Sequence, residues 1–122
     1  MRSILLVALG GAFGAVARYG VALAGLRWGG PGLPWGTWGA NALGCLLIGV
    51  ALPLVRHDDA RLAGVVGFLG AFTTFSTYSA DTVLLWETGR RGLAVANAAG
   101  SVLVGLLFVG LGLMIGRRLA AG

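Results

Sequence analysis

Four long apolar runs constrain this sequence more than any other feature. They cover about Ile4–Leu26, Thr37–Val55, Leu62–Trp86 and Leu93–Ile115. Each run is close to the roughly 20 residues that a helix needs to cross a hydrocarbon core ~30 Å thick. The short separators hold prolines, glycines and charged residues, which end helices or form turns. The sequence therefore predicts an all-α membrane protein, with residues 1–122 as a single domain of four transmembrane helices.

The composition excludes two other classes of protein. Hydrophobic residues make up 57% of the chain and charged residues only 11%, which does not fit an ordinary soluble domain or a disordered one. The net charge of +5 comes from arginines that lie singly or in pairs between apolar runs. No basic patch forms, so we expect no nucleic-acid partner.

The arginine count gives only a weak orientation. Four spans would put Arg2, Arg56, Arg61, Arg117 and Arg118 on one side of the membrane. The other side would hold Arg27, Arg90 and Arg91, together with Arg18, which lies late in the first span. Since positive charges set orientation, a balance of five to four permits insertion in both directions. Ordinary insertion with the N-terminus inside stays open as the alternative.

Small and polar residues recur every four positions in three of the spans. Gly10, Gly14 and Arg18 share one helical face, where a neighbouring helix can pack closely. An arginine at this depth either marks function or reaches back to the interface. Asn41 in the second span and Asn97 in the fourth lie in similar four-residue patterns, the latter with Ser101. Either amide can line a polar path or clamp two helices together.

The third span is the most unusual. Residues Gly67–Ser79 place two glycines and five serine or threonine residues in the middle of the membrane. Such a cluster beside Gly70 favours a broken helix, whose freed carbonyls can coordinate a cation. The alternative is an unbroken glycine-rich helix with its hydroxyls bonded internally.

The polar groups inside the spans are mostly hydrogen-bond donors, which suits an anion. They include Arg18, the Asn41 amide and the hydroxyls of the third span, whereas Asp81 is the only acid within that run. Neither a nucleophile–base pair nor a metal-binding cluster is visible, so we do not expect an enzyme.

Three segments resemble the CrcB/Fluc family of fluoride ion channels. They are Gly10–Tyr19, Gly36–Gly44 and Gly67–Ser79, the last of which is similar to the family motif G-F-x-G-x-x-T-T-F-S-T-F-S. The resemblance implies an antiparallel, dual-topology homodimer of four-helix subunits in the cell (inner) membrane. It also implies passive export of fluoride through two pores, which prevents its toxic accumulation.

The resemblance further implies roles for individual residues. The fluoride path would be lined by Asn41, Phe75, Ser76, Thr77, Tyr78 and, less directly, Ser101. The backbone carbonyls of Gly70 and Thr73 from both subunits would hold a structural Na⁺ at the dimer centre, and Arg18 would lie in the vestibule or pack near it. Tyr78 departs from the family pattern, which has phenylalanine there.

Two other functions compete with this expectation. A small four-helix, proton-coupled multidrug transporter has a similar size, but it requires a membrane-buried carboxylate, and the first span carries Arg18 instead. A non-transporting membrane assembly subunit is the third possibility.

Overall fold

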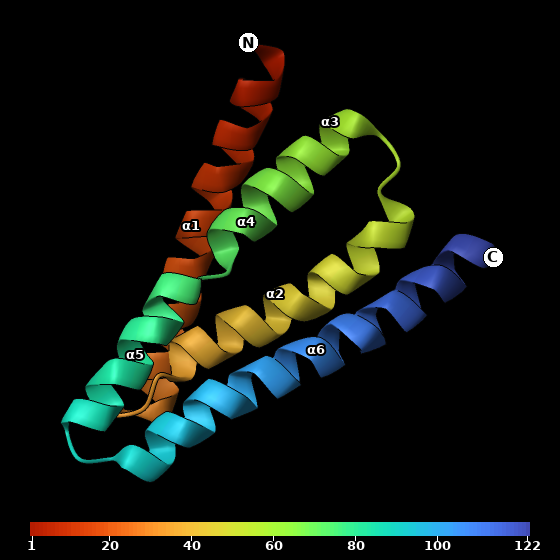
Figure 1. Cartoon of the computed structure of the whole chain (residues 1–122). Coiled ribbons are helices and arrows are strands. Elements are labelled where there is room, and N and C mark those ends of the chain that lie inside the picture. Colours follow the sequence, from red (N-terminus) through yellow and green to blue (C-terminus); the bar gives the residue numbers. More distant parts are fainter.

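The computed structural model describes all 122 residues, and nearly all of them are helical (Figure 1). The helices are α1 (Arg2–Gly29), α2 (Trp35–Leu54), α3 (Asp58–Ala60), η1 (Arg61–Leu69), α4 (Gly70–Phe72), α5 (Phe75–Glu87) and α6 (Arg91–Ala121). Four helical stretches are long and apolar enough to cross a membrane, and the third of these runs from Asp58 to Glu87. The prediction of an all-α, multi-pass membrane protein is confirmed.

Most of the helices extend beyond the apolar runs that predicted them. α1 begins at Arg2 and ends at Gly29, and α6 continues past Ile115 to Ala121. The apolar runs mark the part of each helix that suits hydrocarbon, whereas arginine and alanine continue a helix outside it.

The helices form two closely packed pairs (Figure 1). α1 lies against η1 and α4, and α2 lies along α6, while the ends near residues 30–34 and 88–90 converge (Figure 1). Glycine makes both contacts possible, since a Cβ at Gly14 would overlap the Phe68 backbone and one at Gly112 would overlap the Leu46 carbonyl. The predicted packing face of Gly10, Gly14 and Arg18 is therefore confirmed.

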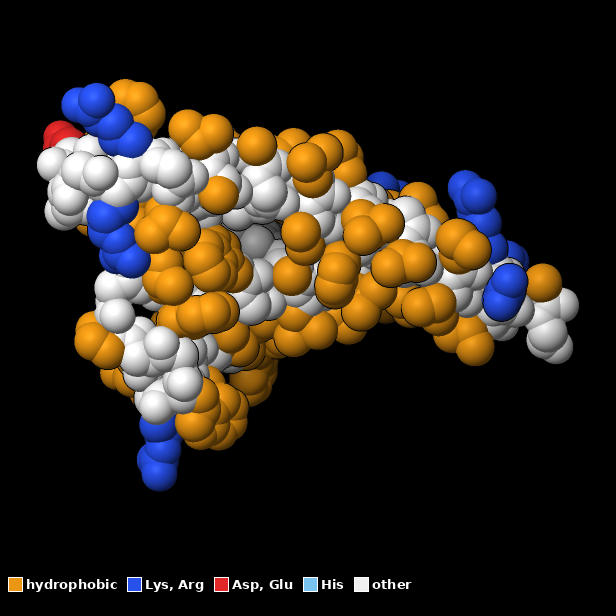
Figure 2. Space-filling view, turned by 90° about the horizontal axis from the view of Figure 1, so that it is seen from below, with side chains coloured by type: hydrophobic (Ala, Val, Ile, Leu, Met, Phe, Trp, Pro, Cys, Tyr) orange, Lys and Arg blue, Asp and Glu red, His pale blue; other side chains and the backbone are white.

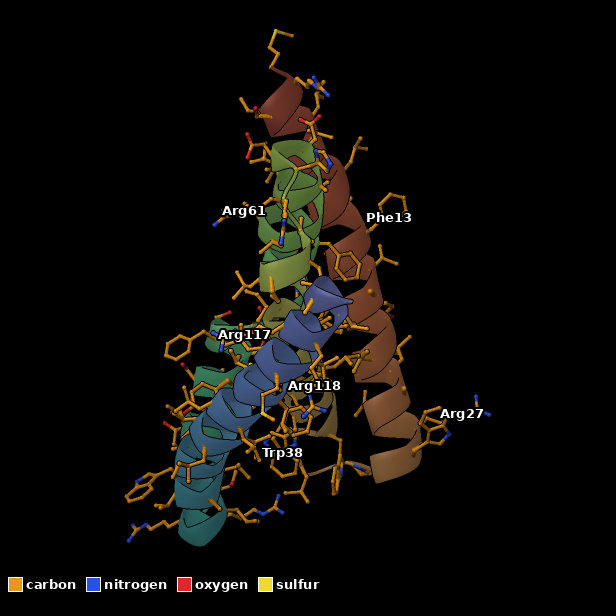
Figure 3. The ribbon with its side chains drawn as sticks, turned by 90° about the vertical axis from the view of Figure 1, so that its right-hand side faces the viewer. Phe13, Arg27, Trp38, Arg61, Arg117 and Arg118 are labelled. Atoms are coloured by element: carbon orange, nitrogen blue, oxygen red, sulfur yellow. The ribbon has the colours of Figure 1, made fainter.

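The surface of the single chain is largely apolar. Only 13 of 122 residues are buried, and apolar side chains cover the middle of the face in Figure 2, with arginines at its ends. Phe13 is 71% exposed and points away from the bundle, whereas Arg61 lies beside the upper half of α1 and Arg27 near its lower end (Figure 3). This distribution fits a surface covered by lipid or by another apolar protein surface.

The third span is broken, as predicted, but not at Gly70. Gly70 is helical, with φ −61° and ψ −36°. The helix stops three residues later, where Thr73 (φ −86°, ψ 157°) and Thr74 (φ −149°, ψ 112°) are extended. The preceding segment Arg61–Leu69 is a π-helix, which the sequence pattern did not predict.

Candidate functional site

The break in the third span is held by a side chain from α2. The Asn41 amide donates to the Thr74 carbonyl at 3.1 Å, and its oxygen accepts from the Thr74 N–H at 2.8 Å. A helix would supply both partners from its own backbone. Asn41 replaces them, so the amide is an interhelical clamp that leaves one N–H of its NH₂ group for another partner.

Thr74 also begins α5. Its hydroxyl accepts from the Thr77 N–H at 3.2 Å and donates to the Thr77 hydroxyl at 3.0 Å. The Ser76 hydroxyl lies 3.3 Å from the same oxygen. Thr74 is therefore the N-cap of α5, a position that threonine favours. Thr73 offers the same side chain one residue earlier, so residue type alone does not locate the break.

The carbonyls of Gly70 and Thr73 are left without a hydrogen bond at the break. The Thr74 N–H would close a helical turn on the Gly70 carbonyl, but it is bonded to Asn41 instead. The Thr77 N–H is bonded to the Thr74 hydroxyl, so it does not reach the Thr73 carbonyl. Gly70 is also exposed in the single chain. These oxygens are free to bind a donor or a cation.

Arg18 caps the first half of the broken span. Its Nε donates to the Ala71 carbonyl at 3.1 Å, in the last turn before the break. A positive group at a helix C-terminus is stabilised by the carbonyls that point toward it. Of the two roles expected for Arg18, packing is the one that this contact describes.

A hollow of about 330 Å³ lies beside the break, between α2, α5 and α6. Four predicted path residues line it: Asn41, Phe75, Tyr78 and Ser101. The Phe75 and Tyr78 rings lie 5.5 Å apart between centroids, with their planes 42° apart. Phe75 is 78% exposed, so this side of the hollow is open in the single chain. Ser76 and Thr77 do not line it.

The Tyr78 hydroxyl is committed to α6. It donates to the Ala98 carbonyl at 2.8 Å, which ties the α5 ring to the neighbouring helix. The sequence left open whether this hydroxyl would offer a further donor. Its proton is already used, so the phenol oxygen can offer only acceptor capacity to the hollow.

Asn97 lies in a polar network that clamps helices together, one of the two roles that the sequence left open for it. Asn97 is 2% exposed and is the only buried polar or charged residue in the chain. Its oxygen accepts from the Trp38 indole N–H and from the Ser101 hydroxyl, and its NH₂ donates to Thr82. The four-residue spacing of Asn97 and Ser101 was visible, but their partners on other helices were not.

One carboxylate lies toward the convergent end of the bundle. Asp81 accepts from the Thr37 hydroxyl at 2.7 Å, which joins α5 to α2. It also lines a polar hollow of about 300 Å³ that includes Thr88 and Arg90. Asp81 does not line the hollow beside the break.

Comparison with known proteins identifies the family. A family model described as CrcB-like protein, Camphor Resistance (CrcB), matches residues 5–113. A protein from Phenylobacterium zucineum is 43% identical over 99% of this chain and 100% of its own length. One from Agrobacterium fabrum is 44% identical over 98% of this chain and 99% of its own length, and both are named fluoride-specific ion channel FluC.

A third relative, from Acidobacterium capsulatum, carries the same name and is 43% identical over 96% of this chain and 98% of its own length. The matches thus cover all four spans, including the break and the hollow beside it. On this evidence the chain belongs to the CrcB-like family.

Proposed function

We propose that this chain is a fluoride-specific ion channel. The observation that carries the proposal is the hollow beside the break, where Asn41, Phe75, Tyr78 and Ser101 come together from three helices. Full-length relatives named fluoride-specific ion channels support the same function.

The chemistry of the hollow fits a small, strongly hydrated anion. Fluoride leaves water only where other donors replace its hydration shell. Asn41 keeps one N–H that Thr74 does not use, and the Ser101 hydroxyl is held by a 3.3 Å bond. The edge of the Phe75 ring carries positive partial charge and adds a weak electrostatic contribution.

Transport is passive in this proposal. The hollow contains no carboxylate that could exchange a proton for the ion, since Asp81 lies elsewhere. Fluoride then moves down its gradient, which exports it from a cell that has accumulated it. We assign the channel to the cell (inner) membrane, and the four apolar spans support a multi-pass membrane location.

The working unit is an antiparallel homodimer in this proposal. Phe75 is 78% exposed, and beside it Ser76 is exposed and Ser79 is half-buried. Polar groups next to a broken backbone are tolerated at membrane depth only against protein or water. A second copy over this face would cover them, and the five-to-four arginine balance permits that copy to insert the opposite way.

The free carbonyls of Gly70 and Thr73 fit a structural Na⁺ shared by the two subunits. Oxygen ligands suit a hard cation, and the exposed position of Gly70 allows approach by a second chain. Two carbonyls from each subunit would neutralise none of the charge but would replace water around the ion. The ion would cross-link the two breaks rather than take part in conduction.

Both alternatives lack a comparable observation. A proton-coupled multidrug transporter needs a buried carboxylate, whereas Asp81, the only acid within the third apolar run, is only half-buried and is bonded to the Thr37 hydroxyl midway along α5. A non-transporting assembly subunit would have no use for a hollow that gathers donors and aromatic edges.

Efflux from liposomes tests the function directly. Purified protein is reconstituted into vesicles loaded with KF or KCl, and valinomycin with an ion electrode reports the release of each anion. We expect rapid fluoride release and no chloride release above that of empty vesicles. Release of neither ion would favour the assembly subunit, and drug-driven proton flux would favour the transporter.

A further inference from the structure

The buried Asn97 amide is hydrogen-bonded to three other helix positions. Trp38 of α2 and Ser101 of α6 donate to its oxygen, the latter at 3.3 Å, and its nitrogen donates to the Thr82 hydroxyl of α5 at 2.7 Å. Thr82 in turn donates to the Tyr78 carbonyl at 2.8 Å. The network therefore connects three helices through one side chain.

The direction of each bond in this network is fixed by chemistry. An indole N–H can only donate, so the Asn97 oxygen must face Trp38 and the nitrogen must face Thr82. The Ser101 hydroxyl then has to donate to that same oxygen, which has no proton to give. The resting position of the Ser101 proton is thus toward Asn97.

The resting orientation of the Ser101 hydroxyl is unfavourable for binding an anion, because its proton points to Asn97. Ser101 lines the hollow beside the break. It also lines a second hollow of about 330 Å³, which Trp38 and Asn41 line as well. While its proton points to Asn97, Ser101 offers an anion only lone pairs. Turning the hydroxyl would convert it into a donor, provided that the buried Asn97 oxygen keeps another partner.

Trp38 is that other partner. We propose that Trp38 and Asn97 are positioning residues that hold the Ser101 hydroxyl at rest and let it turn toward fluoride during passage. When Ser101 leaves, the indole N–H still satisfies the Asn97 oxygen, and Thr82 keeps the amide from rotating. This inference rests on the proposed fluoride channel.

Tyr78 is the less suitable hydroxyl for this exchange. Its bond to the Ala98 carbonyl is 2.8 Å long, against 3.3 Å for the bond from Ser101 to Asn97. The shorter bond is the stronger one. Ser101 is therefore the hydroxyl that can change partners.

A double-mutant cycle tests the coupling. Fluoride efflux is measured for the native protein, Trp38→Phe, Ser101→Ala and the double variant, with Trp86→Phe as the matched control. Trp86 lies near the end of α5, where its ring faces Arg91 at 5.3 Å, outside the network. Without the indole N–H, turning Ser101 would leave a buried oxygen unpaired, so we expect roughly a tenfold loss of rate in Trp38→Phe. In the Ser101→Ala background the same change should cost less than about twofold.

A second variant distinguishes the effect of the size of the Trp38 side chain from the effect of its hydrogen bond. β-(3-Benzothienyl)alanine at position 38 keeps the fused ring and replaces the N–H with sulfur, so it should reproduce the loss even if Trp38→Phe folds poorly. Equal losses in both Ser101 backgrounds would overturn the proposal, because Trp38 would then act on packing alone. Native rates in both position-38 variants would overturn it as well. Failure of the native protein to release fluoride would instead contradict the channel function, and this inference would fall with it.

Discussion

The Asn41 side chain and the Thr74 backbone form a reciprocal pair of hydrogen bonds, 3.1 and 2.8 Å long, across the break in the third span. The side-chain amide of Asn41 carries the same donor and acceptor groups as a peptide bond. It therefore pairs with the Thr74 backbone as another backbone segment would. It pairs both the N–H and the carbonyl of Thr74, so neither group is unpaired where the chain leaves the helix at membrane depth. The same amide lines the hollow beside the break, so the residue that supports the break also faces the proposed fluoride path.

Removing this amide should damage both stability and conduction. Asn41→Ala would leave the N–H and carbonyl of Thr74 unpaired, at about 1–3 kcal/mol for each buried group. We expect a lower midpoint of thermal unfolding in detergent and a severe loss of fluoride efflux. Ser79→Ala is the matched control, because the Ser79 hydroxyl bonds only the Phe75 carbonyl of its own helix. Native stability in Asn41→Ala would contradict the clamp.

Two glycines of α1 should respond very differently to the same methyl group. A Cβ at Gly14 would overlap the Phe68 backbone, whereas one at Gly20 would have no neighbour within 4 Å outside its own helix. Gly14→Ala should therefore separate α1 from η1 and prevent folding. Gly20→Ala should be neutral or stabilising by up to about 1 kcal/mol, because alanine is the better helix former. Expression level and elution as a single species in detergent would distinguish these outcomes.

The sequence predicted these helical contacts better than it predicted the polar ones. Gly10, Gly14 and Arg18 lie four residues apart, and helical periodicity alone places them on one face. The break was expected beside Gly70 but occurs at Thr73 and Thr74, because Asn41 of another helix supplies the missing bonds.

The partners of Asn97 could not be predicted for the same physical reason. A buried amide is defined by its partners, and the Trp38 indole comes from a helix about 60 residues earlier in the chain. Periodicity within one helix says which residues share a face, but it does not say what faces them. The π-helical winding of Arg61–Leu69 had no sequence signal that we recognise.

The proposed sodium site predicts a dimer-specific defect at Gly70. Within the single chain a Cβ at this position would lie 3.9 Å from its nearest neighbour, the Val65 carbonyl oxygen, so Gly70→Val should keep its helical content. The added side chain would instead obstruct a second subunit and the shared ion. We expect native circular dichroism together with loss of the cross-linked dimer and of fluoride efflux. Gly64→Val, where a Cβ would also have room, is the control. A fully active, dimeric Gly70→Val would rule out the shared site.

Arg18 should act through a directed hydrogen bond rather than through its charge alone. Its Nε bonds the Ala71 carbonyl at 3.1 Å, and hydrogen bonds to charged groups contribute about 1.5–3 kcal/mol. Arg18→Lys keeps the charge but loses the guanidinium geometry, so we expect reduced thermal stability in detergent. If Arg18→Lys is as stable as the native protein while Arg18→Gln is not, charge would be the dominant contribution.

The Phe75 and Tyr78 rings give the sharpest test of the aromatic path. They lie 5.5 Å apart on one face of α5 and line the same hollow, but only Tyr78 has a hydroxyl, which is bonded to Ala98. Since that proton is already used, the phenol oxygen presents acceptor capacity to an anion and opposes its passage. Tyr78→Phe removes this oxygen and one hydrogen bond, worth about 1 kcal/mol of stability. We therefore expect unchanged selectivity for fluoride over chloride and an equal or higher rate of efflux, with a slightly lower unfolding midpoint.

Phe75→Ile keeps apolar bulk and removes the ring edge, so its rate of fluoride efflux should fall severely. Initial rates from liposomes at equal protein density compare the two variants directly. If Phe75→Ile conducts normally, the aromatic edges are not part of the path, whatever the rate of Tyr78→Phe.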